Sequence, residues 1–376
     1  MLPSISRTMP PGSRLSRSLQ LRQLRTATRR ETLPSSAIRI FRSVDSVRSW
    51  RAPLTETRRT VGLVPTMGAL HAGHLALIRA AARENHHVVV SVYVNPAQFG
   101  RTEDLESYPS TWEADGRILA ALDRELAGDG ANLGRITAVF APTTRDMYPG
   151  GFPGQDVDSK GSFVTVTPVG EVLEGASRPT FFRGVATVCM KLFNIVQPTR
   201  VYFGQKDAQQ TVVIRRMLAD FMVPSDMVVC PTERDASDGL ALSSRNVYLG
   251  PRRRAVAPVL HRALLAGADV YAHGEGRPDR PSILAAANRV LDDVAAAQNA
   301  LPPSRRALFE VDYVSLTDPD TMLEIDAVDP EVGAILSGAI RMPKLDEVNP
   351  GEDPGHSGGP SVRLIDNVVL PPRRDD

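Results

Sequence analysis

Cysteine is nearly absent from this chain of 376 residues, where only Cys189 and Cys230 occur, both among apolar residues. Neither belongs to a CxxC or Cys/His spacing, which argues against a disulfide scaffold or structural zinc and favours two buried thiols. No uninterrupted apolar run reaches the ~18 residues of a membrane-spanning helix. The chain also lacks an excess of charge of one sign, because it has 44 Lys and Arg and 43 Asp and Glu, which gives a net charge of +1. We therefore expect neither nucleic acid nor a membrane surface as a partner.

The remaining composition is that of a globular protein, with 42% hydrophobic and 23% charged residues. Such a chain can bury a core, which excludes wholly disordered, collagen-like and coiled-coil proteins. The length exceeds what a single core usually organises, so two domains are expected.

Residues 1–36 form an Arg- and Ser-rich leader, with no acidic residue before Glu31 and no apolar core segment. This composition is typical of an organellar transit segment and differs from a signal peptide, although a basic tail without a targeting role has the same composition. We predict that the leader is disordered and lies outside the fold. The expected location is cytoplasmic, or mitochondrial if the leader is a transit peptide.

Residues 37–235 alternate short β-branched runs with longer amphipathic stretches. The runs that predict strands cover residues 60–64, 88–94, 136–140 and 200–203. The stretches that predict helices follow the first run and cover 112–126, 185–196 and 209–221. Strand–helix alternation gives right-handed crossovers and a parallel sheet with helices on both faces. We therefore predict an α/β fold, with a doubly wound, Rossmann-like domain over residues 37–235.

Residues 236–376 show a different order of elements. Ala-rich helical stretches at 255–272 and 282–298 precede three strand-like runs at 309–316, 332–340 and 361–369. Strands gathered after helices predict a smaller α+β domain with an antiparallel sheet. Between the last two runs, residues 344–360 are rich in Pro, Gly and Asp, which predicts a disordered surface insertion.

The segment Pro65–His74 follows the first predicted strand and opens a helix. In an open α/β sheet the ligand lies at the carboxyl ends of the strands, where free N–H groups of a helix N-terminus bind a phosphate. His71 and His74 are three residues apart, so both imidazoles lie on one side of the first turn. Gly68 and Gly73 allow backbone and ligand to approach closely. Simple helix capping and a zinc pair are the alternatives, although the second lacks the HExxH spacing.

Two later segments carry cationic and hydroxyl side chains of the kind that bind the phosphates of a nucleotide. Lys206 follows a predicted strand, where an ammonium neutralises charge on a transferred phosphoryl group. Ser243, Ser244 and Arg245 combine two hydroxyls with a guanidinium, which suits β- and γ-phosphate oxygens. A surface lysine and a polar turn are the respective alternatives.

Five segments, taken in order, resemble one enzyme family. His71-Ala72-Gly73-His74 resembles the HxGH signature of the nucleotidyltransferase superfamily related to class I aminoacyl-tRNA synthetases. The longer run Pro65–His74 is similar to that of the pantoate–β-alanine ligases, also called pantothenate synthetases. The other matching segments are Asn95–Phe99, Arg178–Gly184, Phe203–Asp207 and Asp238–Asn246. Together they cover roughly residues 40 to 250, and a weaker resemblance extends to about 370.

The resemblance implies an AMP-forming carbon–nitrogen ligase that joins (R)-pantoate to β-alanine in pantothenate and coenzyme A biosynthesis. Pantoate carboxylate attacks the α-phosphorus of ATP, pyrophosphate leaves, and the β-alanine amine then attacks the pantoyl adenylate to give pantothenate and AMP. Because water hydrolyses this mixed anhydride, the site is expected to close, with the smaller C-terminal domain acting as a lid. The resemblance also implies a homodimer.

The same resemblance assigns roles to matching residues. His74, His71 and Lys206 are the expected catalytic residues, at the α-phosphate. Gln98 and Gln210 are expected to bind pantoate, with Gln98 also near β-alanine, and as neutral amides they leave the carboxylate nucleophilic. The expected ATP-binding residues are Met67, Gly68, Ala69, Leu70, His71, Ala72, Gly73, His74, Gly204, Gln205, Lys206, Asp207, Glu233, Leu242, Ser243, Ser244 and Arg245.

Magnesium is expected with ATP, bound mostly by phosphate oxygens and water, with Asp115 as a candidate ligand. Three positions depart from the family pattern: Phe181 stands where histidine is expected, Gln205 where glutamate is expected, and Ala208 where an aromatic residue is common. Two other functions stay open. One is a nucleotidylyltransferase, which would need a basic acceptor pocket in place of paired glutamines. The other is a catalytically inactive nucleotide-binding or assembly protein.

Overall fold

The computed structural model describes residues 31–100, 103, 105–106, 108–109, 111–274 and 279–373. The predicted leader falls outside the described residues up to residue 30. Its last part corrects the prediction, because residues 31–36 belong to the fold: Thr32 forms a bridge with Arg39, and Leu33 is 2% exposed. The apolar side chain of Leu33 packs with Ile38 and Leu119 in a core cluster, so this segment belongs to the folded domain.

The N-terminal domain contains a six-stranded sheet in the order β1-β4-β3-β2-β5-β6. Every neighbouring pair is parallel, which confirms the α/β prediction. The strands are β1 (Arg39–Phe41), β2 (Val61–Thr66), β3 (His87–Val92), β4 (Arg135–Phe140), β5 (Arg200–Gly204) and β6 (Asp226–Cys230). The two edge strands, β1 and β6, were not predicted from the sequence.

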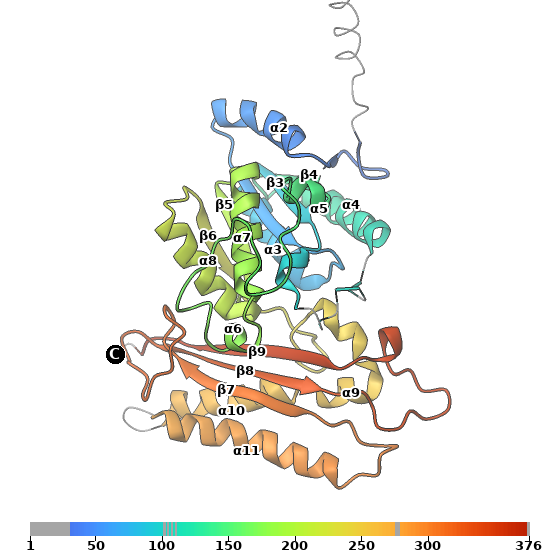
Figure 1. Ribbon diagram of the computed structural model, residues 1–376, viewed down its shortest axis with the longest axis vertical. Helices are drawn as coiled ribbons and strands as arrows, with labels where there is room; N and C mark the ends of the chain where they lie inside the picture. The colour runs from blue at the N-terminus through green and yellow to red at the C-terminus, as the bar shows by residue number, and fades with distance from the viewer. Residues whose placement is uncertain are drawn as a thin grey trace, which may run out of the picture.

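Helices cover both faces of this sheet, as a doubly wound fold requires (Figure 1). One apolar cluster includes α2 (Val44–Glu56), α7 (Phe181–Val196) and α8 (Ala208–Asp220). A second cluster, on the other face, includes α3 (Ala72–Glu84) and α4 (Trp112–Gly128). Two short helices, α5 (Thr144–Met147) and α6 (Glu174–Ser177), lie in the connections.

The C-terminal domain is a three-stranded antiparallel sheet in the order β7-β8-β9. Its strands are β7 (Glu310–Thr317), β8 (Ala334–Met342) and β9 (Val362–Leu370), and its helices are α9 (Gly250–Val256), α10 (Val259–His273) and α11 (Arg280–Asn299). Helices α10 and α11 pack on one face of the sheet and share its apolar core, while the other face looks toward the N-terminal domain (Figure 1). The predicted α+β architecture is confirmed. No helix of the described ranges is long and apolar enough to cross a membrane.

The segment predicted as a disordered insertion, 344–360, is a loop anchored to α9, which corrects that prediction. Arg253 is 1% exposed, and its guanidinium donates to the carbonyls of Pro343 (3.1 Å), Pro354 (3.1 Å) and Pro360 (2.8 Å). Arg252 forms an ion pair with Glu352. Pro- and Gly-rich composition indicates surface loops, but it does not reveal a buried guanidinium that bonds their carbonyls.

Candidate functional site

The predicted site residues lie where the order of the strands reverses along the sheet. From β2 the chain proceeds to β3 and β4 on one side, whereas β5 and β6 lie on the other side. The turn that carries His71 and His74 follows β2, and the turn that carries Lys206 follows the adjacent β5. In open α/β sheets, ligands bind in the crevice at such a switch point.

A cavity of about 240 Å³ lies at this place. It brings together most of the expected residues, from both domains. Its lining includes Met67, His71, Gly73, His74, Gln98, Gly204, Lys206, Asp207, Gln210, Glu233, Leu242, Ser243, Ser244 and Arg245. Gly68, Ala69, Leu70, Ala72 and Gln205 are not among its lining residues.

The two histidines are fixed by backbone hydrogen bonds to their Nδ1 atoms. The amide of Gly73 donates to Nδ1 of His71 (3.2 Å), and the amide of His71 donates to Nδ1 of His74 (3.4 Å). The capping alternative is therefore part of the structure, since both rings cap the start of α3. An accepting Nδ1 carries no proton, so each neutral ring holds its proton on Nε2 and offers an N–H donor. Because both rings line the cavity, they can serve a ligand as well as the helix.

Burial keeps both imidazoles neutral. It lowers the pKa of His71 to about 4, with the charge of Lys206 as a further cause. It lowers the pKa of His74 to about 3, where His71 and Lys206 add to the effect. The ring centroids are 4.1 Å apart, so two cations here would repel each other. In the protein without nucleotide, both rings are uncharged hydrogen-bond donors at neutral pH.

Asp115 holds the turn between β2 and α3 from within the protein. Its carboxylate accepts from the amides of Ala69 (3.0 Å) and Leu70 (2.9 Å) and from the hydroxyl of Thr111 (3.1 Å). The residue is 2% exposed. The expectation that free amides of this turn bind phosphate is thus wrong for Ala69 and Leu70, whose N–H groups are already occupied. A Cβ on Gly68 (φ +85°) would lie 3.0 Å from Asp115 Oδ2, which accounts for glycine at this position.

Lys206 lies on the short 3₁₀ turn η2 (Gln205–Asp207), between β5 and α8. Its ammonium is 3.3 Å from the carboxylate of Asp207, and its side chain is 20% exposed. The side chain of Gln205 leaves the cavity and donates to Oδ1 of Asn367 in the C-terminal sheet (3.0 Å). Gln205 in place of glutamate therefore changes a contact between domains rather than the lining of the cavity.

The serine–arginine segment closes the cavity from the C-terminal side. It begins the 3₁₀ helix η3 (Ser244–Tyr248), where the hydroxyl of Ser243 accepts from the amide of Arg245 (3.3 Å). The hydroxyl of Ser244 donates to the carbonyl of Ala69 (3.1 Å), which joins this segment to the histidine turn. These hydroxyls and the guanidinium therefore meet the histidines in one cavity.

Gln98 is oriented by a chain of buried side chains that sequence reasoning missed. Tyr148 donates to Oδ1 of Asn95 (2.7 Å), and Nδ2 of Asn95 donates to Oε1 of Gln98 (3.1 Å) and to the carbonyl of Gly184 (3.2 Å). The carboxamide of Gln98 is thereby fixed with its NH₂ group available to a ligand. The only sequence signal was an Asn-Pro at the end of a strand.

The adjacent glutamines of α8 have different functions. Gln209 is 5% exposed and donates to the carbonyls of Val169 (2.8 Å) and Val172 (2.7 Å), so it supports the loop before α6. Gln210 lines the cavity, and its side chain makes no hydrogen bond within the part of the chain that the structure describes. Its expected role in binding pantoate stays a prediction.

Phe181 lines the cavity where histidine was expected. The guanidinium of Arg178 lies 3.8 Å from the centre of its ring and forms an ion pair with Glu103. The ring of Phe181 thus holds the guanidinium of Arg178 at the wall of the cavity through a cation–π contact. A neutral imidazole makes such a contact less well.

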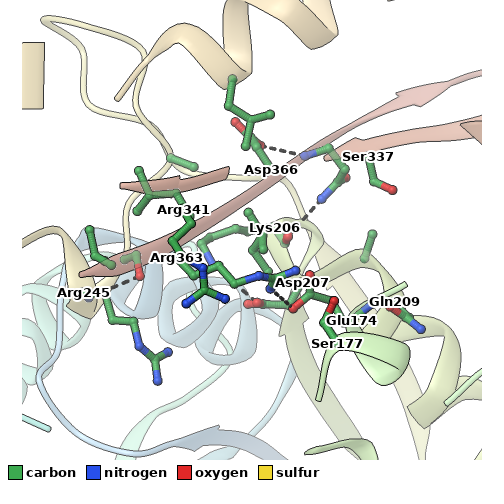
Figure 2. A pocket seen from close by; sticks show the side chains of 18 of the residues that line it. Glu174, Ser177, Lys206, Asp207, Gln209, Arg245, Ser337, Arg341, Arg363 and Asp366 are labelled. Carbon is green, nitrogen blue, oxygen red and sulfur yellow. Dashed lines mark hydrogen bonds and ion pairs between the residues drawn. The ribbon is translucent and has the colours of Figure 1, made fainter. Parts of the chain in front are cut away.

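A second cavity, of about 600 Å³, adjoins the first and lies between the domains. It shares Lys206, Gln210, Ser243 and Arg245 with the smaller cavity. Figure 2 shows Arg341 and Arg363 extending from the C-terminal sheet toward Lys206, Asp207 and Glu174. None of the residues that this sheet contributes was predicted from the sequence, because a strand pattern does not reveal which face meets another domain.

Comparisons with known proteins show the family of this chain. The family model described as Pantoate-beta-alanine ligase matches residues 39–369. The pantothenate synthetase of Chloroflexus aggregans is 44% identical over 333 residues, which cover 89% of this chain and 100% of the relative. That of Thermobifida fusca is also 44% identical, covering 88% of this chain and 95% of the relative.

Solved structures are similar over the same extent. A pantothenate synthetase from Thermus thermophilus has a TM-score of 0.68 and 39% identity, covering 89% of this chain and 99% of that one. A pantoate-beta-alanine ligase from Francisella tularensis, complexed with beta-gamma ATP and beta-alanine, has a TM-score of 0.61 and 28% identity, covering 89% and 98%.

Proposed function

Because this chain belongs to the pantoate–β-alanine ligase family, we propose that its smaller cavity joins pantoate to β-alanine through a pantoyl adenylate. The products are pantothenate, AMP and pyrophosphate. One observation carries the proposal: His71, His74, Lys206, Gln98 and Gln210 line a single cavity at the switch point of the sheet. Paired amides, rather than a basic acceptor pocket, favour a carboxylic acid as the acceptor over the phosphate acceptor of a nucleotidylyltransferase.

In the first step, an oxygen of the pantoate carboxylate forms a bond to the α-phosphorus and the bond to pyrophosphate breaks. Negative charge develops on the phosphoryl oxygens, where the Nε2–H donors of His71 and His74 and the ammonium of Lys206 stabilise it. No enzyme nucleophile takes part. Gln98 and Gln210 hold the acid by neutral hydrogen bonds, so its carboxylate keeps its charge for attack.

In the second step, the free amine of β-alanine bonds to the acyl carbon and AMP leaves with the electron pair of the broken C–O bond. The amine proton passes to solvent or to the departing phosphate. Closure of the C-terminal domain over the cavity limits the competing attack by water on the mixed anhydride.

Magnesium enters this proposal with ATP, whose phosphate oxygens and water supply its ligands, and it screens the triphosphate charge. The described part of the chain holds no group of three His, Cys, Asp or Glu side chains that could bind a metal ion. Asp115 uses both carboxylate oxygens for hydrogen bonds to the protein, so we assign it to the turn. The expected homodimer stays a prediction, which light scattering on the purified chain can test.

The decisive experiment measures AMP formed from ATP by the purified protein with pantoate, with β-alanine, and with both. The proposal requires AMP in amounts that depend on both acids. Lys206→Ala and His74→Ala should each lower pantoate-dependent pyrophosphate release by ~10²–10³, because each removes a donor to the transition state. Full activity in both folded variants would exclude this mechanism, and AMP transfer to a phosphate acceptor would indicate the nucleotidylyltransferase.

A further inference from the structure

One residue of the C-terminal sheet contacts the backbone of the turn that carries Lys206. Nδ2 of Asn367, in β9, donates to the carbonyls of Gln205 (2.8 Å) and Lys206 (2.9 Å). Its Oδ1 accepts from Nε2 of Gln205 (3.0 Å). Asn367 is 5% exposed, so its three hydrogen bonds across the domain boundary are partly shielded from water. One asparagine therefore ties the C-terminal sheet to two consecutive residues of the turn.

The geometry of β9 explains why asparagine lies there. Successive side chains of a strand point to opposite faces. Asp366 accepts two hydrogen bonds from Arg234 (2.6 and 2.8 Å) and lies 3.6 Å from His261 of α10. The next residue, Asn367, therefore points the other way, toward the N-terminal domain. The adjacent buried polar residues thus fix the strand on both sides.

Among the described residues, the ammonium of Lys206 forms its one ion pair within its own turn. Its ion-pair partner is the neighbouring Asp207, on the same turn, and α8 begins without a side-chain cap at that point. The position of the ammonium thus depends on the backbone of η2, which Asn367 holds through two consecutive carbonyls. Reacting groups tolerate little displacement: a shift of ~1 Å can cost on the order of 10²-fold in rate.

We propose that Asn367 is a positioning residue for adenylation, which sets the Lys206 turn when the C-terminal sheet docks on the N-terminal domain. This inference rests on the proposed function. The rate of adenylation would then depend on the position of the C-terminal domain, the expected lid, because a domain that has moved away would leave the turn without its support. Asn367 itself acts through the turn and has no assigned contact with the reacting atoms.

A matched control exists elsewhere on the same sheet. The hydroxyl of Tyr313, in β7, donates to Oε1 of Glu174 (3.0 Å), and Glu174 also pairs with Arg363. This contact joins the same two domains through a hydrogen bond to α6, outside the Lys206 turn. Tyr313→Phe removes one partly buried hydrogen bond between the domains and leaves Arg363 to hold Glu174.

The test compares Asn367→Asp, Asn367→Ala and Tyr313→Phe in pantoate-dependent exchange of labelled pyrophosphate into ATP, which reports the first step alone. Asn367→Asp keeps the volume but puts an oxygen against two carbonyls. We expect the Asn367 variants to lower kcat by ~10- to 100-fold with little change in the KM for pantoate, while Tyr313→Phe stays close to wild type. Gln205→Met, which removes one bond from the turn side, should give a smaller decrease in kcat.

Thermal midpoints are measured for every variant, and rates are compared below the lowest midpoint. Stability losses in the Asn367 variants with unchanged kcat would overturn the inference, as would an equal loss of kcat in Tyr313→Phe. If Asn367→Asp does not fold, Gln205→Met decides: an unchanged kcat counts against Asn367 as a positioning residue. Absence of exchange in the wild-type protein would instead reject the proposed function, so the two failures are distinguishable.

Discussion

At the scale of single residues, the histidine turn shows how one side chain can serve the fold and a ligand together. Nδ1 of each ring accepts a backbone N–H, and this bond leaves Nε2 as the donor toward the cavity. The residue pattern His-x-Gly-His predicted two imidazoles on one side. It could not predict their charge, because burial and the neighbouring Lys206 set the pKa values only after the chain has folded.

The lowered pKa values predict that stability falls in acid. The folded protein holds His71 and His74 neutral down to about pH 4 and 3, whereas the unfolded chain protonates near 6.5. The unfolded state therefore binds more protons below pH 6.5, and stability present above that value is lost as pH falls toward 4. Each histidine contributes at most ~1.4 kcal/mol per pH unit in this range.

Urea unfolding of wild type and His74→Gln between about pH 4.5 and 7.5 checks this expectation. The glutamine amide cannot take up a proton, so the variant should show the flatter dependence on pH. Parallel curves for the two proteins would show that His74 is not held neutral. His86, which lies outside the cavity lining, offers a control through His86→Gln.

At the scale of elements, the central strands and the long helices α3, α4, α7 and α8 were predicted from the sequence, whereas helix α2, which contributes Val47 and Trp50 to the core, and the edge strands were not. The runs that became β2 to β5 are buried on both faces and rich in β-branched residues, so periodicity identified them. β1 has three residues, too few for a pattern, and β6 has an exposed start and only one fully buried residue. The site residues came from motifs, whereas Asn95, Tyr148 and Asn367 act through tertiary hydrogen bonds that no local pattern encodes.

Asp115 also acts through tertiary hydrogen bonds that no local pattern encodes. Its carboxylate, on α4, holds the turn between β2 and α3. Asp115→Asn replaces one acceptor oxygen by an NH₂ group that faces a backbone N–H. We expect a loss of ~1–3 kcal/mol in unfolding free energy and a lower adenylation rate, because the histidine turn loosens. Equilibrium unfolding and pyrophosphate exchange measure both effects.

A titration with magnesium separates this interpretation from a ligand role for Asp115. If the carboxylate binds the metal, high Mg²⁺ should restore the rate of Asp115→Asn toward wild type. If it holds the turn, the rate should stay low at every concentration of Mg²⁺, and restoration would contradict our assignment. Glu113→Gln, an acid in the same first turn of α4, provides the control.

At the scale of the whole molecule, we expect the stability of the C-terminal domain to depend on the buried guanidinium of Arg253. Arg253→Lys keeps a charge but loses the planar fork that reaches the carbonyls of Pro343, Pro354 and Pro360. We expect a loss of ~2–3 kcal/mol, since buried carbonyls are left unpaired, together with faster protease cleavage within 344–360. Arg306→Lys, at an exposed ion pair with Asp346, should cost less than about 1 kcal/mol. Equal losses in the two variants, measured by urea unfolding and limited proteolysis, would argue against this anchor.

The face that the C-terminal sheet turns toward the N-terminal domain has a consequence for turnover. Arginines and a serine stand on it beside Asn367, whereas the leucines of the same strands are kept for α10 and α11. Separating the two domains would therefore expose these polar groups to water, together with the apolar residues that pack across the boundary, Met322 and Ile335. We expect this apolar contact to favour closure again after AMP has left and fresh substrate has entered.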